Sequence, residues 1–364
     1  MKKECLNTAL CFFILLCLSG LVRYFYKKEP RPSTADGSIV MAIGIFSFDA
    51  LLKLPLVSRG FTQLVTLELL IVWLFLVKNY LNQSLHGGFK CLINHTAGQF
   101  GIGTWVAGSS ILALLFFRDF TCYRFIAWLC AFLAFIIWLP YLALSVCNLW
   151  LIVTRQRKVH IGIMLLATVS TQSIVLLTYF MFATTIPRLA YQAVIVLGYS
   201  LYFTGLFIIV RYLLYSRLSR IILGWHSTNS ILHGALSISG LAAATTKVIS
   251  DQLIIVTWFL ATGFLLLVEG ISVIKGIYRF RRAGFTEGIL VYDVSQWARV
   301  FTLGMYYTFN LSLITHQVYV NPLIQWVAYY GQYGVLGIVL FELVNYFYYY
   351  LSSKRIDVHF AYKG

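Results

Sequence analysis

Long apolar runs alternate with short polar segments along the whole chain. Each run is long enough, at about 1.5 Å per helical residue, to cross a hydrocarbon core of about 30 Å. Because the runs are continuously apolar, a transmembrane β-barrel with its alternating strands is excluded. The pattern predicts an all-α polytopic membrane protein with an extra N-terminal helix and ten core helices, at residues 5–22, 37–57, 61–80, 99–117, 121–153, 160–184, 188–216, 227–247, 251–275, 294–318 and 322–351.

The ten core runs are of two alternating kinds. Odd-numbered runs carry clusters of small and hydroxyl residues, such as ATVSTQS and STNSILHGALSISGLAAATTK. Even-numbered runs are rich in large apolar residues, as in FIAWLCAFLAFIIWLPYLAL, where Pro140 is the expected kink point. The small-residue clusters recur about every 60 to 70 residues. The chain therefore predicts five helical hairpins, each pairing a small-residue helix with a bulky apolar one.

Two interpretations of the small residues remain open. They can serve only to let helices pack closely. Alternatively, the five odd helices surround a central pore and the five even helices face lipid, which a strict alternation over five hairpins favours. The candidate pore-lining residues are Gly44, Thr104, Gly108, Thr168, Thr171, Ser230, Gly234, Ser237, Gly304 and Thr308.

Composition and charge limit the class and the orientation. Of the 364 residues, 60% are hydrophobic and 11% are charged, which excludes a cytosolic enzyme, a disordered chain and a nucleic-acid binder. If the helix at 37–57 begins inside, 19 of the 28 Lys and Arg residues lie in inner segments and five in outer ones. Basic residues collect in cytoplasmic loops, so we expect a multi-pass cell-membrane protein with a cytoplasmic C-terminus.

The chain divides into a hydrophobic N-terminal segment with a basic linker (1–36), a transmembrane domain (37–352) and a short cytoplasmic tail (353–364). The N-terminal run allows two interpretations. Lys2 and Lys3 before an apolar stretch are typical of a signal peptide, but no clean small-x-small cleavage site follows. Four basic residues after the run outweigh the two before it, which favours a retained helix with its N-terminus outside.

Ionisable residues within the runs are sparse. Asp49 and Lys53 are four positions apart, so they share a helix face and could pair. His233 is expected to be a structural residue. Three carboxylates on even runs are expected to be packing residues: Glu68, Glu269 and Glu342. No chain of acids follows the odd runs, so a lining of small and hydroxyl residues suits anions better than cations.

Catalytic and metal-binding patterns do not occur in the sequence. The seven cysteines show no CxxC and no Cys/His ligand spacing, which predicts neither a disulfide nor a metal site. No HExxH, GxSxG or aspartate-rich diphosphate motif is found, and Gly101-Ile102-Gly103 lies inside an apolar run rather than at a strand-to-helix turn. We therefore expect no enzyme and no cofactor.

One segment is more specific. Residues 292–306 read YDVSQWARVFTLGMY and resemble the W-x-x-x-F-P-L-G-M-Y signature of the tellurite-resistance/C4-dicarboxylate transporter (TDT) family, which includes the slow-type plant anion channels. Four further segments are similar to family motifs in the same order: GSIVMAIGI at 37–45, GQFGIGTWVAGSSILA at 98–113, LLATVSTQS at 165–173 and TNSILHGALSISGLA at 228–242. The resemblance spans about residues 37–352.

This resemblance implies five hairpins with quasi-fivefold symmetry, odd helices lining a pore, and a homotrimer in membrane lipid with one pore per subunit. It also implies a phenylalanine that plugs the pore, at Phe301 by the motif. Thr302 stands where the family usually has proline, so the helix kink that proline would give next to Phe301 is not expected to be as strong here. The run at 5–22 lies outside the family pattern.

Three functions follow as hypotheses. The first is a gated channel or uniporter for small inorganic or organic anions, with chloride, nitrate, sulfite, malate and tellurite all open. The second is a proton-coupled exporter of dicarboxylate, sulfite or tellurite-type oxyanions, for which His233 is the central titratable candidate. A third, of another class, is a non-transporting receptor or scaffold in which small residues only pack helices.

Overall fold

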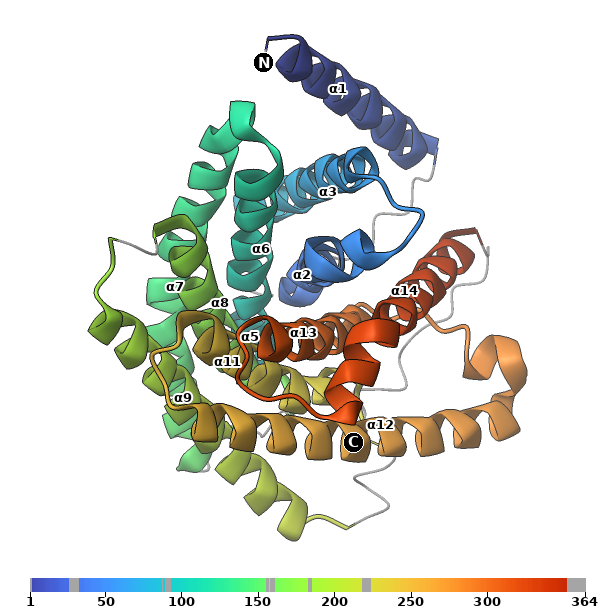
Figure 1. The fold of residues 1–364 in the computed structure, drawn as a ribbon. Coiled ribbons are helices and arrows are strands. Elements are labelled where there is room, and N and C mark those ends of the chain that lie inside the picture. Colours follow the sequence, from blue (N-terminus) through green and yellow to red (C-terminus); the bar gives the residue numbers. More distant parts are fainter. Residues whose placement is uncertain are drawn as a thin grey trace.

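The computed structural model describes residues 2–25, 33–86, 88, 93–154, 157, 161–182, 185–217 and 224–351. This part of the chain is helical throughout and contains no strand (Figure 1). Its α-helices are α1 (Lys2–Phe25), α2 (Gly37–Ile45), α3 (Arg59–Leu85), α5 (Thr96–Gly101), α6 (Gly103–Asp119), α7 (Arg124–Val153), α8 (Leu166–Phe182), α9 (Arg188–Leu214), α11 (Ile231–Thr246), α12 (Asp251–Gly288), α13 (Ser295–Thr315) and α14 (Pro322–Leu351).

Helices occupy all eleven predicted runs. Within the described ranges, nine helical segments are long and apolar enough to cross a membrane. The all-α prediction is thereby confirmed, and the nine long apolar helices are compatible with a multi-pass membrane chain. The segments at α11 and α13 fall outside these nine, because hydroxyls and residues such as His233, Arg299 and Asn310 dilute their apolar content. The basic linker at 26–32 and the tail at 353–364 lie outside the described residues.

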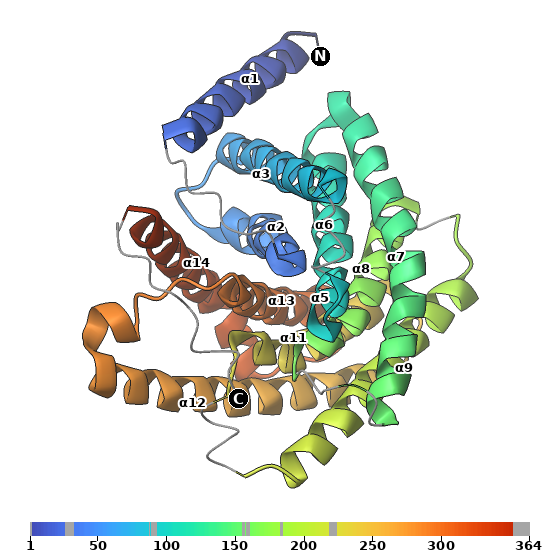
Figure 2. The same cartoon turned by 180° about the vertical axis from the view of Figure 1, so that it is seen from behind.

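Burial separates the helices into two groups. The inner helices, α2, α6, α8, α11 and α13, are buried over most of their length. Each packs against two others in the order α2, α6, α8, α11, α13 and back to α2, so that their contacts close a ring. The outer helices, α3, α7, α9, α12 and α14, lie around this group and expose large apolar side chains (Figures 1 and 2).

Glycines lie where inner helices approach each other most closely. A Cβ atom at Gly44 would lie 2.5 Å from Ile111 of α6, and one at Gly304 would lie 2.8 Å from Ile45 of α2. A Cβ atom at Gly234 would lie 2.1 Å from the Thr302 side chain of α13, and one at Gly108 would lie 3.2 Å from the backbone oxygen of Gly37. These four candidate lining residues therefore serve helix packing in this structure.

The first core segment is not one regular helix. After α2 the chain continues as a π-helix at Phe46–Ala50 and a 3-10 helix at Leu51–Lys53. These segments depart from 3.6 residues per turn, so positions 49 and 53 do not stack as they would on an α-helix. The expected Asp49–Lys53 contact is accordingly not formed within 4 Å, and Asp49 interacts with Thr308 and Arg118 as well as, electrostatically, with Lys53.

Two further expectations are corrected. Helix α12 does not end at 275 but runs to Gly288, bending at Gly284, whose φ is +73°. No proline interrupts the sequence after 275, so only residues 289–294 link α12 to α13. Cys122, expected to be free, is disulfide-bonded, whereas four other cysteines are free: Cys11, Cys17, Cys130 and Cys147. Cys91 lies outside the described residues.

The N-terminal helix packs on α3 from outside the bundle. Ser19 donates a hydrogen bond to Glu68 (2.7 Å), and Arg23 donates to Asn79 (2.8 Å). The two bonds are four residues apart on α1 and eleven apart on α3, so the helices cross at an angle. The contact gives the Glu68 carboxylate a partner within an apolar segment, where an unpaired carboxylate would be costly.

We predict that Gly234→Ala destabilises the purified protein. The added methyl group would meet Thr302, and overpacking of this kind typically costs about 1–3 kcal/mol. Gly263→Ala on α12 is the matched control, because no atom lies within 4 Å of its Cβ position. Thermal unfolding in detergent measures both, and equal melting temperatures for the two variants would contradict tight packing at Gly234.

Candidate functional site

Phe301 lies on inner helix α13 and is only 1% exposed. It follows Ser295, the first residue of α13, by six positions, or about 9 Å along the axis. The helix continues unbroken through Thr302, whose hydroxyl donates to the backbone oxygen of Arg299 (2.9 Å). The segment that resembles the TDT signature thus forms a regular, fully enclosed helix.

Several candidate lining hydroxyls already have partners within the protein. Thr104 donates to the backbone oxygens of Thr34 (3.1 Å) and Gly101 (2.9 Å). Ser230 and Ser237 each donate to a backbone oxygen one turn earlier in the chain, at 2.8 and 2.9 Å. These bonds satisfy one helical carbonyl each and leave the side chains compact.

Thr171 serves a different purpose. Its hydroxyl donates to Ala167 (2.8 Å) and lies 3.2 Å from the indole Nε1 of Trp138, which donates to it from outer helix α7. The neighbouring Gln172 likewise reaches outward, to the backbone oxygen of Ile195 on α9 (3.2 Å). Both residues anchor outer helices, so their contacts do not point into the ring.

Other buried polar groups on the inner segments have no hydrogen-bond partner. They include the Ser47 hydroxyl after α2, the Thr168 hydroxyl on α8 and both ring nitrogens of His233 on α11, together with the hydroxyls of Thr308 and Ser312 on α13. The side chains of Ser47, Thr168 and His233 are fully buried. Buried polar groups in proteins almost always have partners, provided by protein or by ordered water. These inner segments therefore present groups that water or a permeating ion could satisfy.

Charged residues mark the two ends of α13. Arg299, near its start, forms an ion pair with Glu269 of outer helix α12. Thr308, in its second half, lies near Asp49. Arg118, at the end of α6, pairs with Asp119 (2.7 Å) and donates to the backbone oxygen of Ser47 (3.4 Å). Sequence reasoning missed the Arg299–Glu269 pair, because its members are 30 positions apart on different helices.

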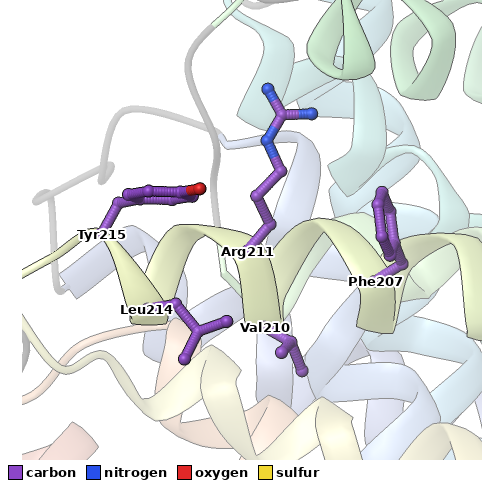
Figure 3. Close-up of a pocket in the computed structure, with 5 residues that line it drawn as sticks. All are labelled: Phe207, Val210, Arg211, Leu214 and Tyr215. Carbon is purple, nitrogen blue, oxygen red and sulfur yellow. The ribbon is translucent and has the colours of Figure 1, made fainter.

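A surface pocket occurs elsewhere, at the end of outer helix α9 (Figure 3). Arg211 extends between the rings of Phe207 and Tyr215, while Val210 and Leu214 lie on the other side. Four of the five lining residues belong to α9, and Tyr215 directly follows its last residue. The pocket is a gap between side chains on the outside of the bundle, unrelated to the inner helices.

Comparison of the chain with protein-family models finds no match, and comparison with curated proteins finds none either. The similarity to the TDT family therefore remains a prediction from its five sequence segments, and the function is argued from the helix arrangement and its buried polar groups.

We predict different thiol accessibility for two neighbouring threonines of α8. In a background with the free cysteines replaced, Thr168→Cys should react with small charged thiol reagents, because its hydroxyl has no protein partner. Thr171→Cys, packed against Trp138, should be protected. Equal reaction rates at both positions would argue against a water-accessible face on this helix.

Proposed function

We propose that the protein transports small anions through a path enclosed by the five inner helices. One observation carries this proposal: the inner helices close a ring, and its segments contribute buried polar groups without partners, including those at Ser47, Thr168 and His233. The five hairpins then form the wall of the path, with the odd helices inside and the even helices toward lipid.

The chemistry of the inner helices favours anions over cations. Helices α8, α11 and α13 contain no acidic residue, and the acids of the other inner segments lie near their ends: Asp36, Asp49 and Asp119. Hydroxyl and imidazole N–H groups can replace part of an anion's hydration shell, whereas a cation path needs negative side chains or convergent carbonyl oxygens. The unpartnered groups are therefore better suited to anions.

Phe301 is the proposed steric block. A phenyl ring inside a narrow path excludes an ion and offers its hydration shell no polar atom. The complete burial of Phe301 on an inner helix supports this role, together with the family-like segment around it. By the same resemblance, we propose a homotrimer with one path per subunit.

The orientation follows from two independent features. The charge bias places the turn between α6 and α7 outside the cell. Cys122 lies in this turn and is disulfide-bonded, and disulfides persist in oxidising, extracytoplasmic compartments. Because α2 begins on the cytoplasmic side in this orientation, α1 before it would enter from the outside, so the proposed N-terminus is outside and the proposed C-terminus is cytoplasmic.

A proton-coupled exporter is the second candidate, because the ring nitrogens of His233 are buried and unpartnered on an inner helix. A non-transporting receptor or scaffold is the third, since Gly44, Gly108, Gly234 and Gly304 serve helix packing. Anion flux into proteoliposomes separates transport from a scaffold. Dependence of that flux on an imposed pH gradient separates coupled export from passive conduction.

We predict that the end of α12 is cytoplasmic. Glu287 is exposed there, so Glu287→Cys gives a reactive thiol without disturbing the core. A membrane-impermeant reagent should label it in inside-out vesicles and not in intact cells. Labelling from the outside of intact cells would reverse the orientation.

We also predict that Phe301→Ala raises anion flux per folded protein. The control is Phe309→Ala, because Phe309 is equally buried on the same helix but packs against Gly240 of α11. Removing an ordinary core phenylalanine costs about 3–5 kcal/mol by the soluble-protein scale and lowers folded yield. Flux is measured in proteoliposomes and normalised to monodisperse protein.

A rise in flux for Phe301→Ala alone supports the block. If both variants only lose folded yield, with flux at or below the wild-type level, Phe301 is an ordinary core residue.

A further inference from the structure

A cluster of ionisable groups gathers beside the first turns of α13. Arg299 of α13 is ion-paired with Glu269 of α12. The guanidinium group also interacts electrostatically with Glu342 of α14 and with His233 of α11. Asn345, one turn after Glu342, completes the cluster and is fully buried. The four consecutive helices α11 to α14 thus converge on one arginine.

The members lie at a common depth. At about 1.5 Å per residue, Glu269 follows the start of α12 by about 27 Å and Glu342 follows the start of α14 by about 30 Å. Arg299 lies about 6 Å from the opposite, starting end of α13. These lengths place all three near one boundary of a hydrocarbon core of about 30 Å. In the proposed orientation this is the cytoplasmic boundary.

The cluster has one more carboxyl group than it has permanent cations. Glu269 pairs with Nη2 of Arg299, whereas Nε of Arg299 and Oε2 of Glu342 are both buried without a hydrogen-bond partner. Glu342 is only 3% exposed, and its neighbour Arg299 is already paired with Glu269. Burying a second negative charge there costs free energy. One proton on Glu342 makes the cluster neutral.

The remaining groups around the cluster do not supply the missing positive charge. His233 is the one further basic group facing Arg299 from the inner helices. The segment before α13 adds Asp293 and Tyr292, and Asp36 faces Tyr292 from the start of the first core segment. Asp293 also faces His226, which lies near Lys275. The further groups that face Glu342 itself are neutral or acidic, so they do not offset its charge. The Arg299–Glu269 pair is partly exposed, with side-chain exposures of 33% and 17%, which gives protons a route inward.

We propose that Glu342 is a proton-binding site and that its proton controls anion transport through the inner ring. The second part rests on the proposed function. A proton from the cytoplasmic side joins Oε2 of Glu342 and leaves Arg299 with Glu269. When the proton leaves, the Glu342 carboxylate competes with Glu269 for the guanidinium. Arg299 is two residues before Phe301, and its backbone oxygen accepts from Thr302, so a shift of Arg299 acts on the helix turn that carries the proposed block.

Infrared difference spectroscopy of the purified full-length protein tests the site without any transport. Acidification should produce a carboxylic-acid C=O band that Glu342→Gln lacks. Glu68→Gln is the matched control, because Glu68 also lies within a span but is bonded to Ser19 and is remote from Arg299. Glu342→Asp keeps the carboxyl group and should restore a shifted band, which identifies the residue even if the glutamine variant folds poorly. An unchanged band in both Glu342 variants would overturn the site.

Flux into proteoliposomes at a series of pH values tests control. Wild-type flux should change with pH, and Glu342→Gln should lose this dependence and stay at the wild-type low-pH level. Glu68→Gln should retain the wild-type profile. A pH-dependent flux that persists in folded Glu342→Gln would overturn control by Glu342. Wild-type protein without flux at any pH would instead overturn the proposed function, and the infrared band would still decide the proton site.

Discussion

Close approach of the inner helices at their glycines is the constraint on which the rest of the structure depends. In lipid, apolar burial gives little drive for helices to associate, so contact distance and packing decide which helices meet. Gly44 joins α2 to α6, Gly304 joins α13 to α2, and Gly234 joins α11 to α13. These contacts close the ring, and the enclosure of Ser47, Thr168 and His233 follows from it.

The outer helices are attached to this ring by aromatic donors. Indole nitrogens of Trp73, Trp138 and Trp258 donate to Ser109, Thr171 and Asn310 of inner helices, and the hydroxyl of Tyr202 donates to the backbone oxygen of Leu232. A hydroxyl on an inner helix therefore has two uses. It can hold an outer helix, as Thr171 does, or it can remain unpartnered inside the ring, as Thr168 does.

This double use explains what the sequence can predict and what it cannot. Helix positions follow from long apolar runs, and the inner and outer groups follow from the alternation of small and bulky residues. Which side of an inner helix faces the ring does not follow from the sequence. Thr168 and Thr171 are the same residue type, and they differ because only Thr171 accepts a hydrogen bond from Trp138. Three further features cannot be predicted from the sequence for a related reason, since each depends on contacts between separate segments: the π-helix around Asp49, the disulfide at Cys122 and the Arg299–Glu269 pair.

An arginine inside a membrane-spanning helix is tolerated only when acidic or polar groups of the surrounding protein compensate its charge. Arg299 meets this condition through α12 and α14, two outer helices that expose large apolar side chains elsewhere. The same side chain stands two positions before Phe301, on the helix that also provides the glycine contact at Gly304. A change in the charge balance at Arg299 would therefore act on a tightly packed helix, and α13 is the inner helix on which the proposed electrostatic control and the proposed steric block coincide.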